Sequence, residues 1–367
     1  MAKKIRIIGG VTLTLLWAAL SLLAWFLPAR AHSLWERRAL QQRPEITGGA
    51  LLSGSFMDQF EDYAVDQFPF RVAFRSAKAL FTYGVLQQKD NNGIYIADGY
   101  AAKLEKTYSD PSVSYALKKL NEIYTRYLQD AGSRIYVTVI PDKGFYLAEA
   151  NGYPAMDYHK LFTQISEGMP WAQMIDIASA LSISDYYRTD THWRQEKLLG
   201  VAKRLCSAMN VTGPGEAVFT PVLATQQFYG VYYGQAALPM PAEDLFVMQS
   251  SVLDGCTVYN HETGKIQPIY DMAQLSGPDP YEVYLSGPQA LLTIENPAAK
   301  TDRELIIFRD SFGSSLAPLI LQDYRTVTLV DIRYVSSATL HKYLTFHGQD
   351  VLFAYSTLIL NSSHSLK

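Results

Sequence analysis

The stretch "ELIIFRDSFGSSLAPLI", residues 304–320, decides the fold prediction for this chain. Its first half is a short apolar run, which is typical of a strand that is buried on both faces of a parallel sheet. Leu316, Leu319 and Ile320 then follow a turn at helical spacing. We therefore expect Ser311 at the carboxyl end of a strand and the amino terminus of a helix, where open α/β sheets bind ligands. Backbone N–H groups at this turn, including that of Gly313, would point toward an oxyanion.

Strand and helix patterns alternate on both sides of this unit. A strong amphipathic helix is expected over "SDPSVSYALKKLNEIYTRYLQDAG", residues 109–132, followed by a buried strand "IYVTVIP" at 135–141. Further helices are expected at 157–168 and 193–209, and a buried strand at the end of the chain. This order predicts an α/β domain with a largely parallel sheet. Between about 212 and 295 the helical pattern fades into Gly, Pro and Tyr with short runs such as "YEVYLSG", which predicts a β-rich insertion.

The amino terminus predicts export. Lys3, Lys4 and Arg6 precede an uncharged run from Ile7 to Ala29. At ~1.5 Å per residue, such a helix crosses a hydrocarbon core about 30 Å thick. The basic residues place the amino terminus in the cytosol and the rest of the chain outside the membrane. The alternative is a secreted protein, released by signal cleavage at the Ala-x-Ala sequence that ends at Ala31.

These signals divide the chain into three parts. Residues 1–33 form a cytoplasmic stub and a single-pass membrane anchor, residues 34–54 a charged juxtamembrane linker, and residues 55–367 the α/β domain with its insertion. The net charge of −3 gives no electrostatic case for nucleic acid. The two cysteines, Cys206 and Cys256, either pair outside the cell or remain free thiols.

A second segment, "DYYRTDTHWRQEK" at residues 185–197, carries a possible base. Asp190 lies two residues before His192, so both side chains leave the same side of an extended stretch. In a catalytic triad, Asp190 would hold the Nδ1 proton of His192, and Nε2 would accept the proton of Ser311. The structural alternatives are a helix-capping serine and a histidine that packs beside Trp193.

Several motifs together resemble the DHHW family of exported bacterial proteins, which is similar to the SGNH-hydrolase-like proteins of alginate O-acetylation. They are "RTDTHW", the strand followed by Asp-Ser-Phe, "NGIYIADGY", "VIPDKG" and "YSTLILNSS". The resemblance runs from about Trp35 to the end of the chain. It implies an SGNH-hydrolase-like, flavodoxin-like fold, in which Asp190, His192 and Ser311 match the family's triad.

The chain also departs from that pattern. Thr191 replaces the middle histidine of the family's naming motif, and Arg309 stands where SGNH enzymes often carry glycine. No Gly-x-Asn-Asp block supplies a second oxyanion donor, so Arg333 and Tyr334, after the next strand, are the candidates. Two further residues have both a substrate and a structural interpretation. Lys143 would bind an anionic group of a polymer or lie in a loop, and Tyr187 would line a sugar cleft or pack.

The function that this resemblance implies is an anchored O-acetyltransferase that acts on a cell-surface polysaccharide. An acetyl-esterase on the same polymer and a non-catalytic glycan-binding protein of the cell envelope are the alternatives. A transferase would need an acetyl supply across the membrane, which in relatives comes from a multi-pass acyltransferase. A metal-dependent hydrolase is the weakest alternative, because only one of the seven histidines lies near an acid at ligand-like spacing and no His-x-x-x-His pair occurs. We therefore expect neither a metal nor another cofactor.

Overall fold

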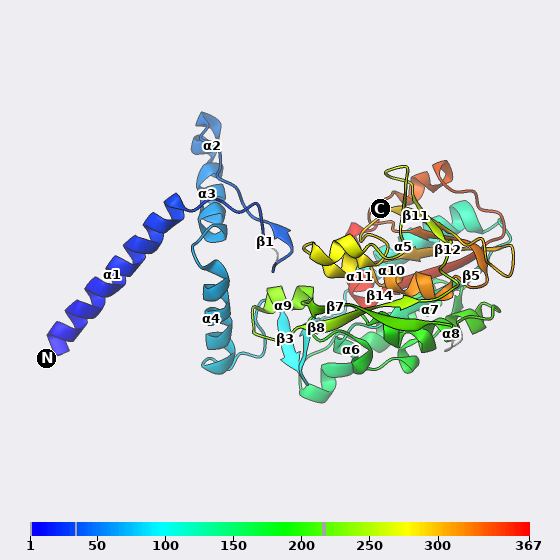
Figure 1. The fold of residues 1–367 in the computed structure, drawn as a ribbon, viewed down its shortest axis with the longest axis horizontal. Helices are drawn as coiled ribbons and strands as arrows, with labels where there is room; N and C mark the ends of the chain where they lie inside the picture. Colours follow the sequence, from blue (N-terminus) through cyan, green and yellow to red (C-terminus); the bar gives the residue numbers. More distant parts are fainter. Residues whose placement is uncertain (1, 34, 215–217) are drawn as a thin grey trace. The chain divides into compact units, whose positions relative to one another are not determined.

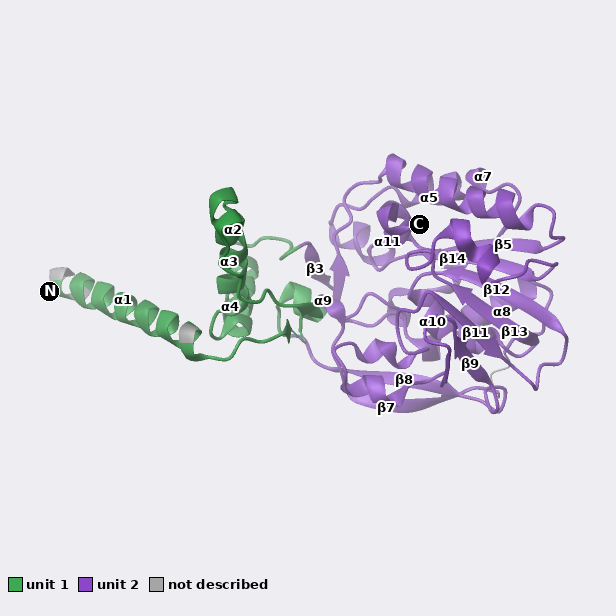
Figure 2. Ribbon diagram, turned by 90° about the horizontal axis from the view of Figure 1, so that it is seen from above, with its two compact units in different colours: residues 1–92, 233–239 green, residues 93–232, 240–367 purple. Residues whose placement is uncertain are grey.

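The computed structural model describes residues 2–33, 35–214 and 218–367. Leu34, where the predicted linker begins, and residues 215–217 of the predicted insertion lie outside the described residues. The chain forms two compact units (Figures 1 and 2). Unit 1 contains residues 1–92 and 233–239, and unit 2 contains residues 93–232 and 240–367.

The centre of unit 2 is an eight-stranded sheet with the order β10-β9-β11-β13-β12-β14-β5-β6. The five strands at one end run parallel, as the sequence predicts. They are β13 (Tyr324–Val330), β12 (Arg303–Arg309), β14 (Asp350–Ser356), β5 (Arg134–Ile140) and β6 (Gln173–Met174). The remaining three are antiparallel and come from the stretch predicted as β-rich. They are β11 (Leu291–Glu295), β9 (Thr257–Asn260) and β10 (Lys265–Gln267).

Alternation along the central strands feeds two hydrophobic cores. In β12, Leu305 and Ile307 face one core, whereas Ile306 and Phe308 face the other. Helix α8 (Leu199–Ala208) packs on the first face, and α5 (Asp110–Ile123) and α7 (Tyr158–Gly168) cover the second. The result is a three-layered arrangement, which agrees with the α/β domain and largely parallel sheet predicted from the alternation of helices and strands.

Short elements complete unit 2. A hairpin is formed by β3 (Ile94–Ala97) and β4 (Tyr100–Lys103), with positive φ angles at Asp98 and Gly99 in its turn. The others are α6 (Gly144–Leu147), the separate hairpin of β7 (Thr220–Phe228) and β8 (Glu243–Gln249), α10 (Phe312–Leu316) and α11 (Thr357–Asn361).

Two local expectations differ from the structure, and the choice left open for the cysteines is settled. The run "YEVYLSG" is no strand, because it begins in a 3₁₀ turn at Pro280–Val283 that starts with proline. The helix expected from residue 193 begins only at Leu199, after a separate 3₁₀ turn at Gln195–Lys197. Cys206 and Cys256 are both free thiols, and burial raises the pKa of Cys206 to about 12.

Unit 1 is mainly helical. Helix α1 (Ala2–Phe26) contains the stretch Arg6–Ala24, which within the described ranges is the one helix long and apolar enough to cross a membrane. The following elements are β1 (His32–Ser33), β2 (Arg38–Ala39), α2 (Gly48–Ser53), α3 (Ser55–Asp66), α4 (Arg71–Gly84) and, from the second segment, α9 (Val231–Ala236). Most of α9 lies in unit 1, since the boundary falls after Tyr232.

Candidate active site

Ser311 lies where the sequence places it, between the end of β12 and the first residue of α10. The neighbouring Asp310 fixes this turn from within. One of its carboxylate oxygens accepts a hydrogen bond from the backbone N–H of Phe312 at 3.0 Å. The other accepts one from the N–H of Ser356, at the end of β14, at 2.8 Å. Ser311 thereby sits at the carboxyl edge of two adjacent parallel strands.

The three predicted triad residues lie in one chain of hydrogen bonds. Nε2 of His192 is 2.7 Å from Oγ of Ser311, and Nδ1 of His192 is 2.5 Å from Oδ1 of Asp190. In the tautomer that this chain selects, Ser311 donates to Nε2 and Nδ1–H donates to Asp190. Asp190 is fully buried, whereas Ser311 is partly exposed. The serine hydroxyl is therefore the most exposed member of this chain of hydrogen bonds.

The loop that carries Asp190 and His192 is held at several points. Nε1 of Trp193 donates to Oγ of Ser315 on α10 at 2.9 Å, which ties the loop to the helix after Ser311. The second oxygen of Asp190 accepts from the N–H of Val231 at 2.8 Å. Gly230 packs so closely here that a Cβ atom would lie 2.2 Å from the Cα of Asp190. No side chain can replace this glycine without moving Asp190.

Thr191, which stands where the family's motif has a histidine, faces away from this chain of hydrogen bonds. Its hydroxyl accepts a hydrogen bond from the phenol of Tyr232 at 3.0 Å. It is a structural contact between the loop and the segment after β7.

Tyr281 is a site residue that the sequence did not indicate. Its ring stacks on the imidazole of His192, with centroids 3.8 Å apart and an interplanar angle of 6°. Its hydroxyl is 2.8 Å from Oγ of Ser315. Tyr281 belongs to the 3₁₀ turn in the stretch predicted as β-rich, so that stretch supplies a wall of the site. No periodic pattern marks this contact, because one isolated aromatic residue in a turn makes it.

Arg309 lies buried beneath the Ser311 turn. Its Nη1 donates to Oγ of Ser314 at 3.0 Å and to the carbonyl of Asp310 at 3.3 Å, on both sides of Ser311. Asp331 is 4.0 Å away and counters its charge. Among the described residues, Nε and Nη2 of Arg309 have no hydrogen-bond partner. Burial lowers the pKa of Arg309, although Asp331 acts in the opposite direction.

Gly313 has a different role in the structure from the one expected. Its N–H donates to the carbonyl of Asp310 at 3.1 Å, so this donor is already used within the turn. A Cβ atom on Gly313 would lie 2.7 Å from the Cβ of Arg309. Glycine at this position therefore lets the arginine pass under the helix.

The candidate second oxyanion donors lie after β13. The guanidinium of Arg333 pairs with both carboxylate oxygens of Asp331, at 2.9 and 2.6 Å, and is committed to that ion pair. The side chain of Tyr334 is 49% exposed, and the guanidinium of Arg333 lies 5.4 Å from its ring centroid. Neither contact directs a donor at Ser311.

The two candidate substrate contacts are both buried. Lys143 is 2% exposed, and its ammonium donates to the backbone carbonyls of Tyr187 at 2.9 Å and Arg188 at 3.2 Å. Burial lowers its pKa to about 7. Tyr187 is fully buried and packs edge-to-face on Phe228. Both residues thus hold the loop that carries the Asp190–His192 pair, and neither faces a polymer.

This arrangement suits acyl transfer. In a catalytic triad, the hydroxyl at a strand–helix turn is the nucleophile and the imidazole bonded to it is the base. The buried carboxylate behind the imidazole is the orienting acid. The stacked Tyr281 fixes the imidazole plane, and Trp193 ties the loop to α10. The turn that presents the hydroxyl is fixed from below by Asp310 and Arg309.

Comparisons with known proteins give information on the fold. No protein-family model matches the sequence, and comparison with curated proteins found no match. Among solved structures, a DHHW family protein from Eubacterium siraeum is similar, with a TM-score of 0.61 and 20% identity. The similarity covers 75% of this chain and 94% of that one.

Bacillus cereus PatB1 is also similar. Its structure with a sulfonyl adduct gives a TM-score of 0.56 and 18% identity, and covers 73% of this chain and 95% of that one. A second PatB1 structure gives a TM-score of 0.54 at the same identity and covers 73% of this chain and 96% of that one. At these identities the likeness concerns the fold. The predicted resemblance to DHHW-type, SGNH-like proteins is confirmed at that level.

Proposed function

We propose that this chain is a serine-dependent acyl-ester enzyme, and that it transfers O-acetyl groups to a cell-surface polysaccharide. The observation that carries the proposal is the hydrogen-bonded chain from Ser311 through His192 to Asp190, at 2.7 and 2.5 Å. A structural serine cap would need no histidine on its hydroxyl, and a packed histidine would need no buried carboxylate behind it. The three together are the arrangement that activates a serine.

The first half-reaction forms an acetyl-enzyme. Oγ of Ser311 attacks the carbonyl carbon of an acetyl ester while its proton passes to Nε2 of His192. Asp190 accepts the Nδ1 proton in a hydrogen bond and stabilises the imidazolium. The donor's alkoxide then leaves and takes the proton from Nε2. The N–H of Ser311, at the start of α10, is the donor that we assign to the oxyanion.

The second half-reaction decides between transfer and hydrolysis. A sugar hydroxyl that gives its proton to Nε2 attacks the acetyl carbon, and Ser311 leaves as the alcohol after it recovers the proton. If water takes the place of the sugar, the same steps make an esterase. The resemblance to the alginate O-acetylation proteins supports transfer. The acceptor is then a polysaccharide outside the membrane that α1 would cross, and a multi-pass acyltransferase would supply the acetyl group.

The proposal is tested with the full chain in detergent micelles and a chromogenic acetyl ester, with and without a polysaccharide acceptor. We expect release of the chromophore by the unaltered protein and none above background for Ser311→Ala or His192→Ala. An acceptor that gains acetyl groups, detected by mass spectrometry, identifies a transferase. Equal release by all three folded proteins would contradict a role for Ser311 and His192.

A further inference from the structure

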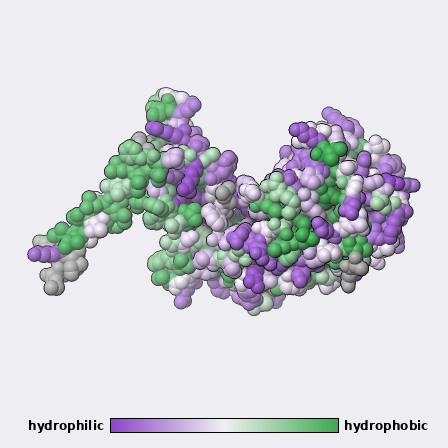
Figure 3. Space-filling view, viewed as in Figure 1, coloured by the Kyte–Doolittle hydropathy of each residue, from purple (hydrophilic) through white to green (hydrophobic). Residues whose placement is uncertain are grey.

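Helix α4, in unit 1, has a largely exposed apolar face, on which Phe74 contacts Phe68 and borders a hollow shared with α1. Phe70, Phe74, Ala77, Phe81 and Val85 follow one another at helical spacing, and all five are exposed. The four large side chains are 68%, 49%, 53% and 65% exposed. Ala73 and Leu80 widen the same face. Figure 3 shows apolar surface along this helix. A continuous stripe of this width is typical of a helix that lies against an apolar phase.

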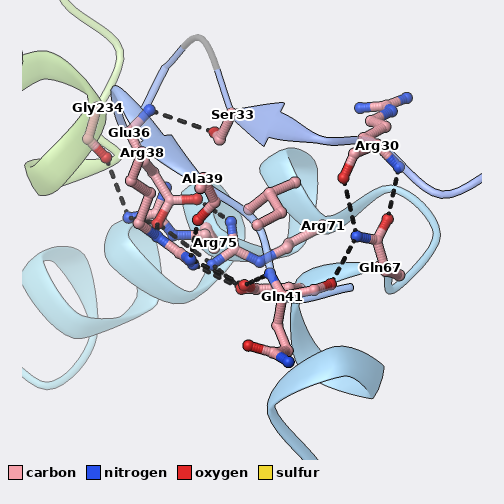
Figure 4. A network of polar contacts seen from close by, with 12 residues as sticks. Arg30, Ser33, Glu36, Arg38, Ala39, Gln41, Gln67, Arg71, Arg75 and Gly234 are labelled. Atoms are coloured by element: carbon pink, nitrogen blue, oxygen red, sulfur yellow. Dashed lines mark hydrogen bonds and ion pairs between the residues drawn. The ribbon is translucent and has the colours of Figure 1, made fainter. Parts of the chain in front are cut away.

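The face of α4 beside the stripe is held by polar contacts. Arg71 pairs with Glu36, and Arg75 donates to the carbonyl of Gly234 at 3.0 Å (Figure 4). Asp66 lies within reach of Arg71 at 3.4 Å and takes two hydrogen bonds from Arg38, which lower its pKa to about 2. These ion pairs and hydrogen bonds determine which side of α4 packs on the rest of unit 1. The apolar stripe lies on the exposed side.

The start of α4 is tied to the end of the membrane-crossing helix. The N–H of Arg30 donates to the side chain of Gln67 at 2.8 Å, and the same side chain donates to the carbonyl of Arg30 at 3.0 Å (Figure 4). Arg30 follows the last residue of α1, Phe26, by four positions. Four residues span at most about 14 Å, so Arg30 lies within that distance of the end of α1. The hydrogen bonds to Arg30 keep the Gln67 side chain in the same region. Arg71, the first residue of α4, is four positions after Gln67.

The charge beside the stripe complements an anionic surface. The helix contains no acidic residue, and of its three basic residues Lys78 is the one outside the contacts with Glu36 and Gly234. Lys78 borders the apolar stripe, on the side of Phe74 and Val85 by its helical position. A basic residue beside an apolar face with phenylalanines is a feature of a helix that lies in the headgroup region of a membrane.

We propose that α4 lies in the membrane interface, with the stripe from Phe70 to Val85 inserted among the lipids of the bilayer that α1 crosses. The apolar side chains would then enter the boundary between headgroups and acyl chains by about 5–10 Å. This inference rests on α1 as the anchor, and it is independent of the triad chemistry. Unit 1 thereby has two attachments to the membrane, one that crosses it and one that lies in it.

Site-specific quenching tests this inference on the full chain. Cys206→Ala and Cys256→Ala provide a background without native thiols, and a fluorophore is attached to single cysteines at chosen positions. Phe81→Cys places it on the stripe, and Ser76→Cys places it on the same helix outside the stripe. Leu16→Cys, in the middle of α1, reports whether the anchor is inserted. The proteins are reconstituted into vesicles of phosphatidylethanolamine and phosphatidylglycerol that contain a lipid with a nitroxide near its headgroup.

We expect the nitroxide lipid to quench the label at residue 81 several-fold more than the label at residue 76. A water-soluble quencher should give the opposite order. If residue 16 is protected from water and residue 81 is quenched only by the aqueous reagent, the inference is overturned while the anchor stands. If the labels at residues 16 and 81 are both open to the aqueous quencher and unaffected by the bilayer, both the anchor and the inference fail. Protection of residue 81 from both quenchers would assign the stripe to a protein partner or a second copy, and would also overturn the inference.

Discussion

The ring of Tyr281 lies flat on the imidazole of His192, with the two centroids 3.8 Å apart and the planes 6° apart. The same tyrosine is 2.8 Å from Ser315 through its hydroxyl, so its position is fixed from the helix that follows Ser311. An aromatic face stabilises a cation above it. If His192 becomes an imidazolium during acyl transfer, Tyr281 stabilises that state and also fixes the ring's plane.

Replacement of Tyr281 by a residue without an aromatic ring should therefore lower kcat. For Tyr281→Leu we expect about 1–2 kcal/mol less transition-state stabilisation, or roughly a 5- to 30-fold decrease in kcat for an acetyl ester. Tyr281→Phe keeps the ring and should stay within about threefold of the unaltered enzyme. Steady-state kinetics of both variants check this, and equal losses would show that the hydroxyl contact matters instead of the ring.

Gly230 should tolerate no side chain. A Cβ atom would lie 2.2 Å from the Cα of Asp190, against backbone that cannot easily move. We expect Gly230→Ala to cost about 1–3 kcal/mol of unfolding free energy, by overpacking. Activity should fall as well, because Asp190 is displaced from His192.

Gly200 provides the matched control, because nothing lies within 4 Å of its Cβ position in α8. Gly200→Ala should stabilise the protein by about 0.5–1 kcal/mol, since alanine favours a helix over glycine. Chemical denaturation and ester hydrolysis measure both effects. A Gly230→Ala protein with unchanged stability and activity would disagree with the packing described for Asp190.

Arg309 should matter more for activity than for stability. Its replacement by methionine removes a desolvated charge with two unpartnered nitrogen atoms, and Asp331 retains Arg333 as a partner. We expect the unfolding free energy of Arg309→Met to change by less than about 2 kcal/mol. The Ser311 turn loses its contacts from below, so kcat should fall by roughly tenfold through poorer positioning.

Ser314→Ala is the control for this variant, because it removes only one of the two contacts of Arg309. Its loss in kcat should be smaller than that of Arg309→Met. The opposite order would show that Ser314 acts on the turn independently of the arginine.

Lys143 should make stability depend on pH. Burial lowers its pKa from the ordinary 10.5 to about 7. Below pH ~7 the residue is charged in both states, and the cost of the buried charge is fully present. Between about 7 and 10.5 the unfolded chain binds one more proton, so stability rises with pH by up to about 1.4 kcal/mol per unit. Unfolding at pH 7 and pH 9 should show this gain in the unaltered protein and not in Lys143→Met. The prediction is wrong if the unfolding free energies of the unaltered protein and Lys143→Met change with pH in parallel.

The part of the site that the sequence predicted is the part that follows from local patterns. An apolar run followed by helical spacing places Ser311 at a strand–helix turn, because a short run such as "ELIIF" is typical of a buried parallel strand. Asp190 and His192, two positions apart, share one side of the chain for the same local reason. The central parallel sheet follows from the alternation of such units.

The contacts that the sequence missed depend on side chains from distant segments or on their direction. Tyr281 reaches His192 from a 3₁₀ turn whose sequence resembles a strand, because "YEVY" contains tyrosine and valine, which favour strands. Lys143 and Tyr187 lie at the predicted sheet edge, yet both side chains point inward to the loop they support. The position of a residue after a strand predicts that it lies at the edge of the sheet. It does not determine the direction in which the side chain points.

The most direct test of the central claim is covalent capture of Ser311. Bacillus cereus PatB1 has been solved with a sulfonyl adduct, so a sulfonyl fluoride is the reagent of choice. Oγ of Ser311 would bond to sulfur as fluoride leaves, and His192 would take the proton. Intact mass and peptide mapping should find one sulfonyl group on Ser311 in the unaltered full chain, much slower labelling in His192→Ala, and none in Ser311→Ala. Labelling at another residue, or to the same extent in Ser311→Ala, would contradict the account.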